Sequence, residues 1–219
     1  MIPERVQYIS RASRLSAGDF AQDEPGSYTI HSTANERSTA QNERDNLENN
    51  AGSASFHSVV DDKEVVRCIP FSHRAWHAGD GTKAGGGNMT SLALEICESG
   101  DREQTLQNAI AVVANDLQQL GWGVERLRQH YDWTGKNCPR ILRDTGRWEW
   151  FVQQVQQTME EEQSMIYNYI DENMPAWARE AVQWAVDSGV LAGDGQGLNL
   201  DDRDLRTLCW LYRAEKENE

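Results

Sequence analysis

Three side chains that can ligate a metal ion stand out among the histidines and cysteines of this 219-residue chain. His130 and Cys138 lie in the segment QHYDWTGKNCP, where Gly135 is expected to interrupt any helix and leave a loop. A catalytic zinc ion takes three protein ligands, often imidazole and thiolate, and leaves a fourth position open. His31 ends a short β-prone run and is the third candidate. Spacing alone leaves open that all three are ordinary packed or surface residues.

Glu95 is a carboxylate inside the apolar run SLALEIC, residues 91–97. Burying a carboxylate costs free energy unless the group is paired or takes part in function. Catalysis and an ion pair with an arginine are therefore equally good interpretations. Other catalytic motifs are lacking, since no H-E-x-x-H segment occurs and the glycines at 85–87 lack the lysine of a phosphate-binding loop.

Helical and β-prone patterns alternate around these residues. Apolar residues recur at helical spacing over residues 102–120, and Gly121 is placed to end that helix. Similar patterns predict helices over residues 40–48 and 143–159 and strands over residues 28–30, 56–60, 64–69 and 91–97, with the middle two joined as a hairpin. Residues 1–27 are expected to be an extended lead-in. Such a mixture predicts an α/β or α+β domain.

Charge divides the chain into two parts. Residues 1–157 carry 16 basic and 21 acidic side chains, a net charge of −5, whereas residues 158–219 carry 5 and 14, a net charge of −9. We predict a catalytic domain over residues 1–157, a linker over 158–173 and a helical module over 174–219. In that module Pro175 is suited to open one helix and Asp201 to cap another. About 45 residues are marginal for independent stability, which favours a binding partner.

Composition argues against several functional classes. The net charge is −14 and no cluster of lysine and arginine occurs, so no nucleic-acid partner is expected. No run approaches the roughly 18–20 apolar residues that span a bilayer, so membrane insertion is not expected. The four cysteines are too widely spaced for a disulfide scaffold. The segment MIPERVQYISRASR lacks the apolar core of a secretory signal peptide, so we expect synthesis in a cytoplasm.

Five stretches occur in a fixed order: YTIHSTAN (28–35), SFHSVVDDKEVVRCIP (55–70), AWHAGDGT (75–82), GNMTSLALEICESGD (87–101) and QHYDWTGKNCPRILR (129–143). In content and order they resemble the N-acetylmuramoyl-L-alanine amidase type 2 family, which includes phage endolysins and animal peptidoglycan-recognition proteins. The resemblance extends over roughly residues 6–157. It implies an α/β fold with a mixed central sheet flanked by helices, and hydrolysis of the amide bond between N-acetylmuramic acid and L-alanine in peptidoglycan.

The resemblance also implies roles for individual residues. It makes His31, His130 and Cys138 the ligands of Zn²⁺, which would activate a water molecule. It assigns Glu95 as the general base and Lys136 as the group that stabilises the oxyanion.

The substrate cleft implied by the resemblance contains Trp76, His77 and Phe56. Some relatives carry a proton-transferring tyrosine near the position of Phe56, and because phenylalanine cannot transfer a proton, Glu95 is favoured for that role. Ser32 is a second departure, since asparagine is frequent there.

Two alternatives belong to other functional classes. A peptidoglycan-binding protein without catalysis would resemble relatives that have lost the cysteine ligand, but Cys138 is present here. A glycosidase needs two carboxylates that flank a sugar bond, and the sequence singles out no such pair.

The remaining expectations concern origin and the end of the chain. The family implies a phage or prophage endolysin that lyses Gram-positive hosts and, without a signal peptide, reaches the wall after holin-type release. The stretch PAWAREAVQWAVDSGVLAGDGQGLNL resembles helical modules at the ends of clostridial-type phage endolysins. We expect this module to target the cell wall or to form a homodimer. Its negative charge argues against simple attraction to anionic wall polymers.

Overall fold

A computed structural model describes residues 2–10, 16–21, 24–49, 52–164 and 166–216 of the chain. The chain forms two compact units, residues 1–156 and 157–219. No helix in the described ranges is both long enough and apolar enough to cross a membrane. All four cysteines are buried thiols.

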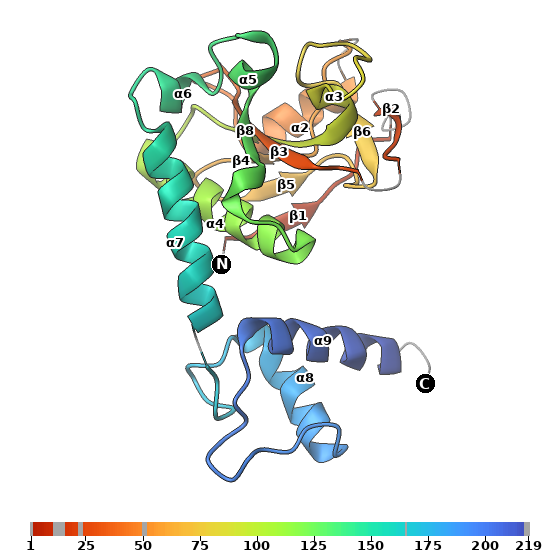
Figure 1. Cartoon of the computed structure of the whole chain (residues 1–219), viewed down its shortest axis with the longest axis vertical. Coiled ribbons are helices and arrows are strands. Elements are labelled where there is room, and N and C mark those ends of the chain that lie inside the picture. Colours follow the sequence, from red (N-terminus) through yellow and green to blue (C-terminus); the bar gives the residue numbers. More distant parts are fainter. Residues whose placement is uncertain (1, 11–15, 22–23, 50–51, 165, 217–219) are drawn as a thin grey trace. The chain divides into compact units, whose positions relative to one another are not determined.

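A six-stranded sheet forms the centre of the first unit, in the order β1-β5-β4-β7-β3-β8 (Figure 1). Its strands are β1 (Glu4–Val6), β3 (Ser27–Ser32), β4 (Ser58–Val60), β5 (Val65–Arg67), β7 (Ser91–Ile96) and β8 (Leu127–Gln129). Neighbours run parallel except β4 and β5, which form the predicted hairpin. The sheet is mixed, as expected. A separate two-stranded sheet pairs β2 (Ser16–Asp19) with β6 (His73–Ala75).

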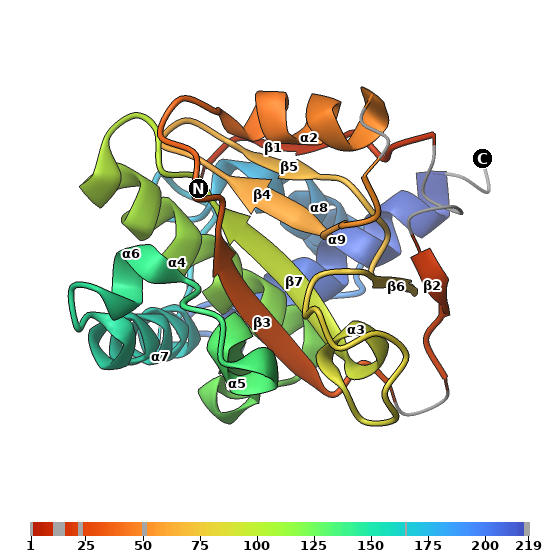
Figure 2. The same ribbon diagram turned by 90° about the horizontal axis from the view of Figure 1, so that it is seen from above.

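Helices cover both faces of the six-stranded sheet (Figure 2). On one face, Leu47 of α2 (Ala40–Asn49) belongs to an apolar cluster with Val59, Val66 and Ala93. On the other face lies α4 (Arg102–Leu120), whose Asp116 reaches Arg67 of β5. Coverage of both faces explains why β7 is apolar along nearly its whole length.

Helix α4 has the bounds that its apolar spacing predicts. Asp101 caps its first turn by accepting a hydrogen bond from the Gln104 amide, at 3.0 Å. Gly121 ends the helix in the left-handed conformation, at φ +67°. The buried stripe includes Leu106, Ala109 and Val113.

Two expectations about the first unit need correction. The predicted extended lead-in carries β1, which pairs with β5, and β2, which pairs with β6. The helix expected over residues 143–159 is instead a short α6 (Arg140–Arg143) followed by α7 (Trp148–Ser164). The break comes where Gly146 adopts φ +65°. Helix α7 continues past the division between the two units.

The second unit contains α8 (Ala176–Asp187) and α9 (Asp202–Lys216). Its core combines Val182 and Ala185 of α8 with Leu205 and Leu208 of α9. Asp201 caps α9 as predicted, accepting a hydrogen bond from the Asp204 amide at 2.8 Å. Tyr167, within the expected linker, is buried in this core and pairs with Leu200. Part of that segment is therefore folded.

Candidate metal centre and cleft

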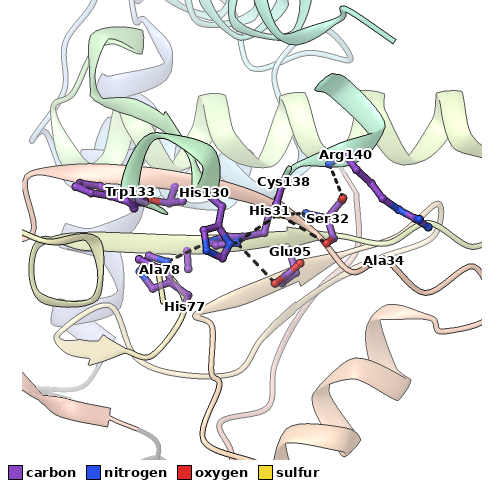
Figure 3. A network of polar contacts seen from close by, with 12 residues as sticks. His31, Ser32, Ala34, His77, Ala78, Glu95, His130, Trp133, Cys138 and Arg140 are labelled. Carbon is purple, nitrogen blue, oxygen red and sulfur yellow. Dashed lines mark hydrogen bonds and ion pairs between the residues drawn. The ribbon is translucent and has the colours of Figure 1, made fainter. Parts of the chain in front are cut away.

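Parallel strands bring two of the predicted site residues side by side. His31 lies near the carboxyl end of β3 and is in register with Glu95 on the adjacent β7. Partners in register project from the same face of a sheet. Strand β8 also runs parallel to β3 and delivers His130 directly after its last residue. Figure 3 shows these side chains converging at the edge where ligands usually bind in α/β sheets.

His130 is the first residue of a short helix, α5 (His130–Thr134), and not part of a loop as predicted. The Asp132 side chain accepts a hydrogen bond from the Gln129 amide at 2.8 Å, and the Gln129 side chain accepts one from the Asp132 amide. This reciprocal pair is a capping box at the start of the helix. Gly135 ends the helix at φ +75°. The glycine therefore stops the helix but does not prevent it.

Cys138 is held against β3 by backbone and side-chain contacts. The Ser32 amide donates to Cys138 Sγ at 3.4 Å, and the Arg140 amide donates to Ser32 Oγ at 3.1 Å. Glu98 binds the Arg140 guanidinium and also accepts from the Ala34 amide at 3.0 Å. These contacts fix the cysteine beside His31.

His31, His130 and Cys138 form the one group of three potential metal ligands in the described part of the chain. All three are buried. Nδ1 of His31 lies 3.0 Å from Nδ1 of His130 and 3.7 Å from Cys138 Sγ. In a tetrahedral zinc site with bonds of ordinary length, two ligand nitrogens lie about 3.3 Å apart, and a ligand nitrogen and sulfur lie about 3.6 Å apart. The donor set therefore fits Zn²⁺ in chemistry and spacing.

The charge states of the three side chains also suit a metal. Burial lowers the pKa of His31 and of His130, so both imidazoles are neutral at neutral pH. Burial, with the nearby Glu95, raises the pKa of the Cys138 thiol to about 12. A metal ion must therefore displace a proton from Cys138, and the amide of Ser32 favours the resulting thiolate.

Glu95 lies next to the three potential metal ligands but is not one of that group. Its Oε1 is 4.0 Å from Nδ1 of His31, and its buried Oε2 has no hydrogen-bond partner. Burial, with repulsion from Glu43, raises the pKa of Glu95 to about 8, and Lys136 opposes that rise. No arginine pairs with Glu95 among the described residues, so the ion-pair interpretation loses its support. A carboxyl group with a pKa near neutrality can accept a proton.

All the remaining predicted site residues line one cleft of about 290 Å³. Lys136 is exposed at its edge and Trp76 is half-buried. Phe56 is largely buried and belongs to the apolar cluster under α2. His77 is also buried, and its ring contacts the side of His31 that faces away from His130 and Cys138.

Several residues that shape the site lie within the five stretches that resemble the amidase family, but the sequence did not reveal their roles. Ser32, Glu98 and Arg140 hold the cysteine, and Asn88 lies buried directly after the glycines at 85–87. Most of their contacts join residues far apart in the chain, so no local pattern could have shown what they bind.

Together the fold and the site define an α/β protein with a buried group of metal-ligand type at the base of an open cleft. Residues 21–141 match the family described as N-acetylmuramoyl-L-alanine amidase. The chain belongs to this family.

Curated relatives agree with the assignment. The amidase CwlA of Bacillus subtilis (strain 168) is 48% identical over 124 residues, which make up 55% of this chain and 45% of that protein. The amidase XlyB of the same organism is 44% identical over 138 residues, 61% of this chain and 42% of that protein. The chain thus spans less than half the length of these two relatives.

Solved structures resemble the fold over most of the chain. The PlyG catalytic domain is 32% identical with a TM-score of 0.65, covering 72% of this chain and 96% of that one. A mutant endolysin from Bacillus subtilis is 30% identical with a TM-score of 0.64, covering 71% and 99%.

Proposed function

We propose that the protein is a zinc-dependent amidase that hydrolyses the bond between the lactyl group of N-acetylmuramic acid and L-alanine in peptidoglycan. The observation that carries the proposal is the buried group of His31, His130 and Cys138 at the base of a cleft. The names of its relatives specify this bond, and the donor set fits the metal.

Zinc, when bound by these three side chains, supplies a Lewis acid that polarises a carbonyl group and acidifies water. Glu95 accepts the proton of the attacking water at its unpartnered carboxylate oxygen and later delivers it to the leaving amine. The raised pKa of Glu95 suits both transfers. Lys136, at the edge of the same cleft, donates to the oxyanion that forms when the carbonyl is attacked.

The sides of the cleft bind the glycan and the stem peptide. Trp76 presents a half-buried ring suited to packing against a sugar or a peptide plane. Phe56 contributes the apolar wall beneath it. His77 also lines the cleft, and its ring packs against His31.

The proposal extends to the biological setting of the protein. The solved structures with this fold include an endolysin from Bacillus subtilis, which supports a place for this protein among phage or prophage endolysins that act on Gram-positive walls after holin-type release. In this setting the second unit targets the wall or joins two copies of the chain. Peptidoglycan is the partner of the first unit.

The alternative is a protein that binds peptidoglycan without cutting it. The complete donor set and the unpartnered oxygen of Glu95 favour the enzyme, because binding alone requires neither.

Chelation and metal replacement test the proposal. Purified full-length protein should contain about one zinc per chain, lose wall-lytic activity on treatment with a chelator, and regain it when zinc is restored. Full activity in a verified metal-free preparation would refute zinc dependence.

A further inference from the structure

His31 is linked through a chain of hydrogen bonds to a backbone carbonyl. Nε2 of His31 lies 3.0 Å from Nδ1 of His77, and Nε2 of His77 lies 3.1 Å from the Ser91 carbonyl oxygen. A carbonyl oxygen can only accept, so Nε2 of His77 carries the proton. Nδ1 of neutral His77 must then accept from Nε2 of His31. Nδ1 of His31, which faces His130 and Cys138, is left with its lone pair free for a metal.

His130 is also linked by a hydrogen bond to a backbone carbonyl. The Ala78 backbone carbonyl accepts a hydrogen bond from its imidazole. Nδ1 of His130 faces His31, whereas Nε2 lies on the side of residues 78–79, about 3.7 Å from where a Cβ on Gly79 would sit. The proton therefore lies on Nε2, and Nδ1 is again free to ligate. Adjacent residues thus support the two ligand histidines (Figure 3).

A single buried side chain holds both of these adjacent residues. Oδ1 of Asn88 accepts from the His77 amide and from the Ala78 amide, each at 2.7 Å. Nδ2 of Asn88 donates to the Gly81 carbonyl at 3.1 Å, which orients the side-chain amide. Asn88 is 2% exposed, so water cannot replace these contacts.

The backbone around Asn88 is itself fixed. Asp80 accepts from the Gly87 amide at 2.6 Å and from the Asn88 amide at 3.3 Å. A Cβ on Gly87 would lie 2.6 Å from Cβ of Ala78 and 2.7 Å from the Trp133 ring. The glycine thus lets the segment approach residue 78 closely. The glycine-rich segment before Asn88 is therefore held in place against residue 78.

We infer that Asn88 is a positioning residue which, through His77 and the Ala78 carbonyl, fixes both ligand histidines in the tautomer that leaves Nδ1 free for the metal. This inference rests on the proposed zinc site but concerns Asn88, which belongs neither to the ligand group nor to the lining of the cleft. It also gives His77 a role in addition to the expected substrate contact. Outer partners of this kind typically change metal affinity by about 10–100-fold when they are removed.

The test compares the zinc affinities of full-length variants by competition with a chromophoric chelator. Asn88→Ala should bind zinc about 10–100-fold more weakly than the unaltered protein. Asn88→Asp keeps an acceptor for both amides and should recover most of the affinity. Asn108→Ala is the matched control, since Asn108 is also buried and bonded to backbone, through the Asp61 carbonyl at 2.9 Å, but belongs to α4.

Zinc binding by Asn88→Ala at the affinity of the unaltered protein would overturn the inference. An equal loss in Asn108→Ala would also overturn it, because the effect would then reflect general destabilisation. A failure of the unaltered protein to bind zinc would instead refute the proposed function, so the two failures can be told apart.

A second measurement needs no variant and therefore does not depend on folding of the altered chain. Nitrogen chemical shifts in histidine-labelled, metal-free protein at neutral pH report which ring nitrogen carries the proton. We expect Nε2–H for His31, His77 and His130. Protonation of Nδ1 in His31 or His130 would contradict the inference.

Discussion

At the scale of single residues, Glu95 is the group whose removal should separate catalysis from metal binding. It lies in the cleft with one unpartnered oxygen and does not belong to the ligand group. Glu95→Gln keeps size and polarity, so we expect unchanged zinc content and unfolding temperature with a rate about 10²–10⁴-fold lower. Turbidity loss of purified walls measures the rate.

Glu43→Gln is the matched control, because Glu43 is a second carboxylate that lines the same cleft. It should lower the rate only a few-fold. Unfolding of Glu95→Gln, or an equal loss of rate in both variants, would show that the Glu95 carboxylate is not the base.

Zinc affinity should depend on pH in a defined direction. The thiol pKa of Cys138 is raised to about 12, so the metal-free protein holds a proton on Cys138 at neutral pH, and zinc uptake must release it. Affinity should therefore rise with pH, by about tenfold per pH unit near neutrality, and calorimetry in buffers of different ionisation enthalpy should count at least one released proton. Cys138→Ser should bind zinc more weakly and lose this dependence; a pH-independent affinity in the unaltered protein would exclude thiolate ligation.

At the scale of secondary-structure elements, a buried ion pair ties α4 to the sheet. Arg67 donates to both carboxylate oxygens of Asp116 at 2.7 Å, and the Tyr28 hydroxyl donates to the same group at 2.7 Å. Asp116→Ala would remove the buried partner of the Arg67 guanidinium and leave it with the more exposed Glu4 carboxylate and the Ser58 hydroxyl. We therefore expect a loss of about 3 kcal/mol in the free energy of unfolding, the lower end of the range for a broken buried pair.

Asp101→Ala provides the comparison within the same helix, because it removes only the cap of α4 and should lose about 1 kcal/mol. Urea denaturation followed by circular dichroism measures both values. Similar losses in the two variants would mean that the ion pair contributes little beyond what the helix cap contributes.

The elements also show what the sequence could and could not reveal. Helix α4 was predictable to the residue because a repeated apolar stripe, a capping aspartate and a terminal glycine all agree. Strands β1, β6 and β8 have three residues each and, unlike the equally short β4 and β5, contain no pair of adjacent valines that marks a β-prone run. They exist because neighbouring strands offer hydrogen bonds. Helix α5 has only five residues, which is too short to show a helical spacing of apolar residues.

The candidate ligands His31, His130 and Cys138 could be named through a family resemblance, whereas spacing alone left them ambiguous. The structure adds how these three side chains and their neighbours are arranged in space, which the sequence does not show. His77 lines the cleft, and its ring also contacts His31 and the Ser91 carbonyl, which the sequence could not reveal because β3 and β7 are adjacent only in the folded chain.

At the scale of the whole molecule, the first unit should work without the second. Every proposed site residue lies before residue 157, where the division between the units falls. We expect residues 1–164, which retain all of α7, to fold and to cut purified peptidoglycan at a rate within a few-fold of the full chain. A truncated protein that folds and binds zinc yet fails to cut would assign a catalytic role to the second unit.

The second unit should act in targeting or in association. Its core is small and its surface exposes Trp210 and Tyr169, at 68% and 66% of their full areas. Binding of fluorescently labelled residues 157–219 to intact walls would support targeting. A full-length dimer that dissociates on truncation, measured by sedimentation, would support association. If the unit neither binds walls nor forms a dimer, the proposed role is wrong.

The central claim is the bond that the protein cuts. Mass spectrometry of purified cell-wall fragments after digestion by the zinc-loaded protein identifies that bond directly. The account predicts stem peptides with a free L-alanine amino terminus and glycan strands with intact glycosidic bonds, and no such products after zinc has been removed. New reducing sugar ends, or peptides cleaved within the stem while L-alanine remains attached to N-acetylmuramic acid, would contradict it.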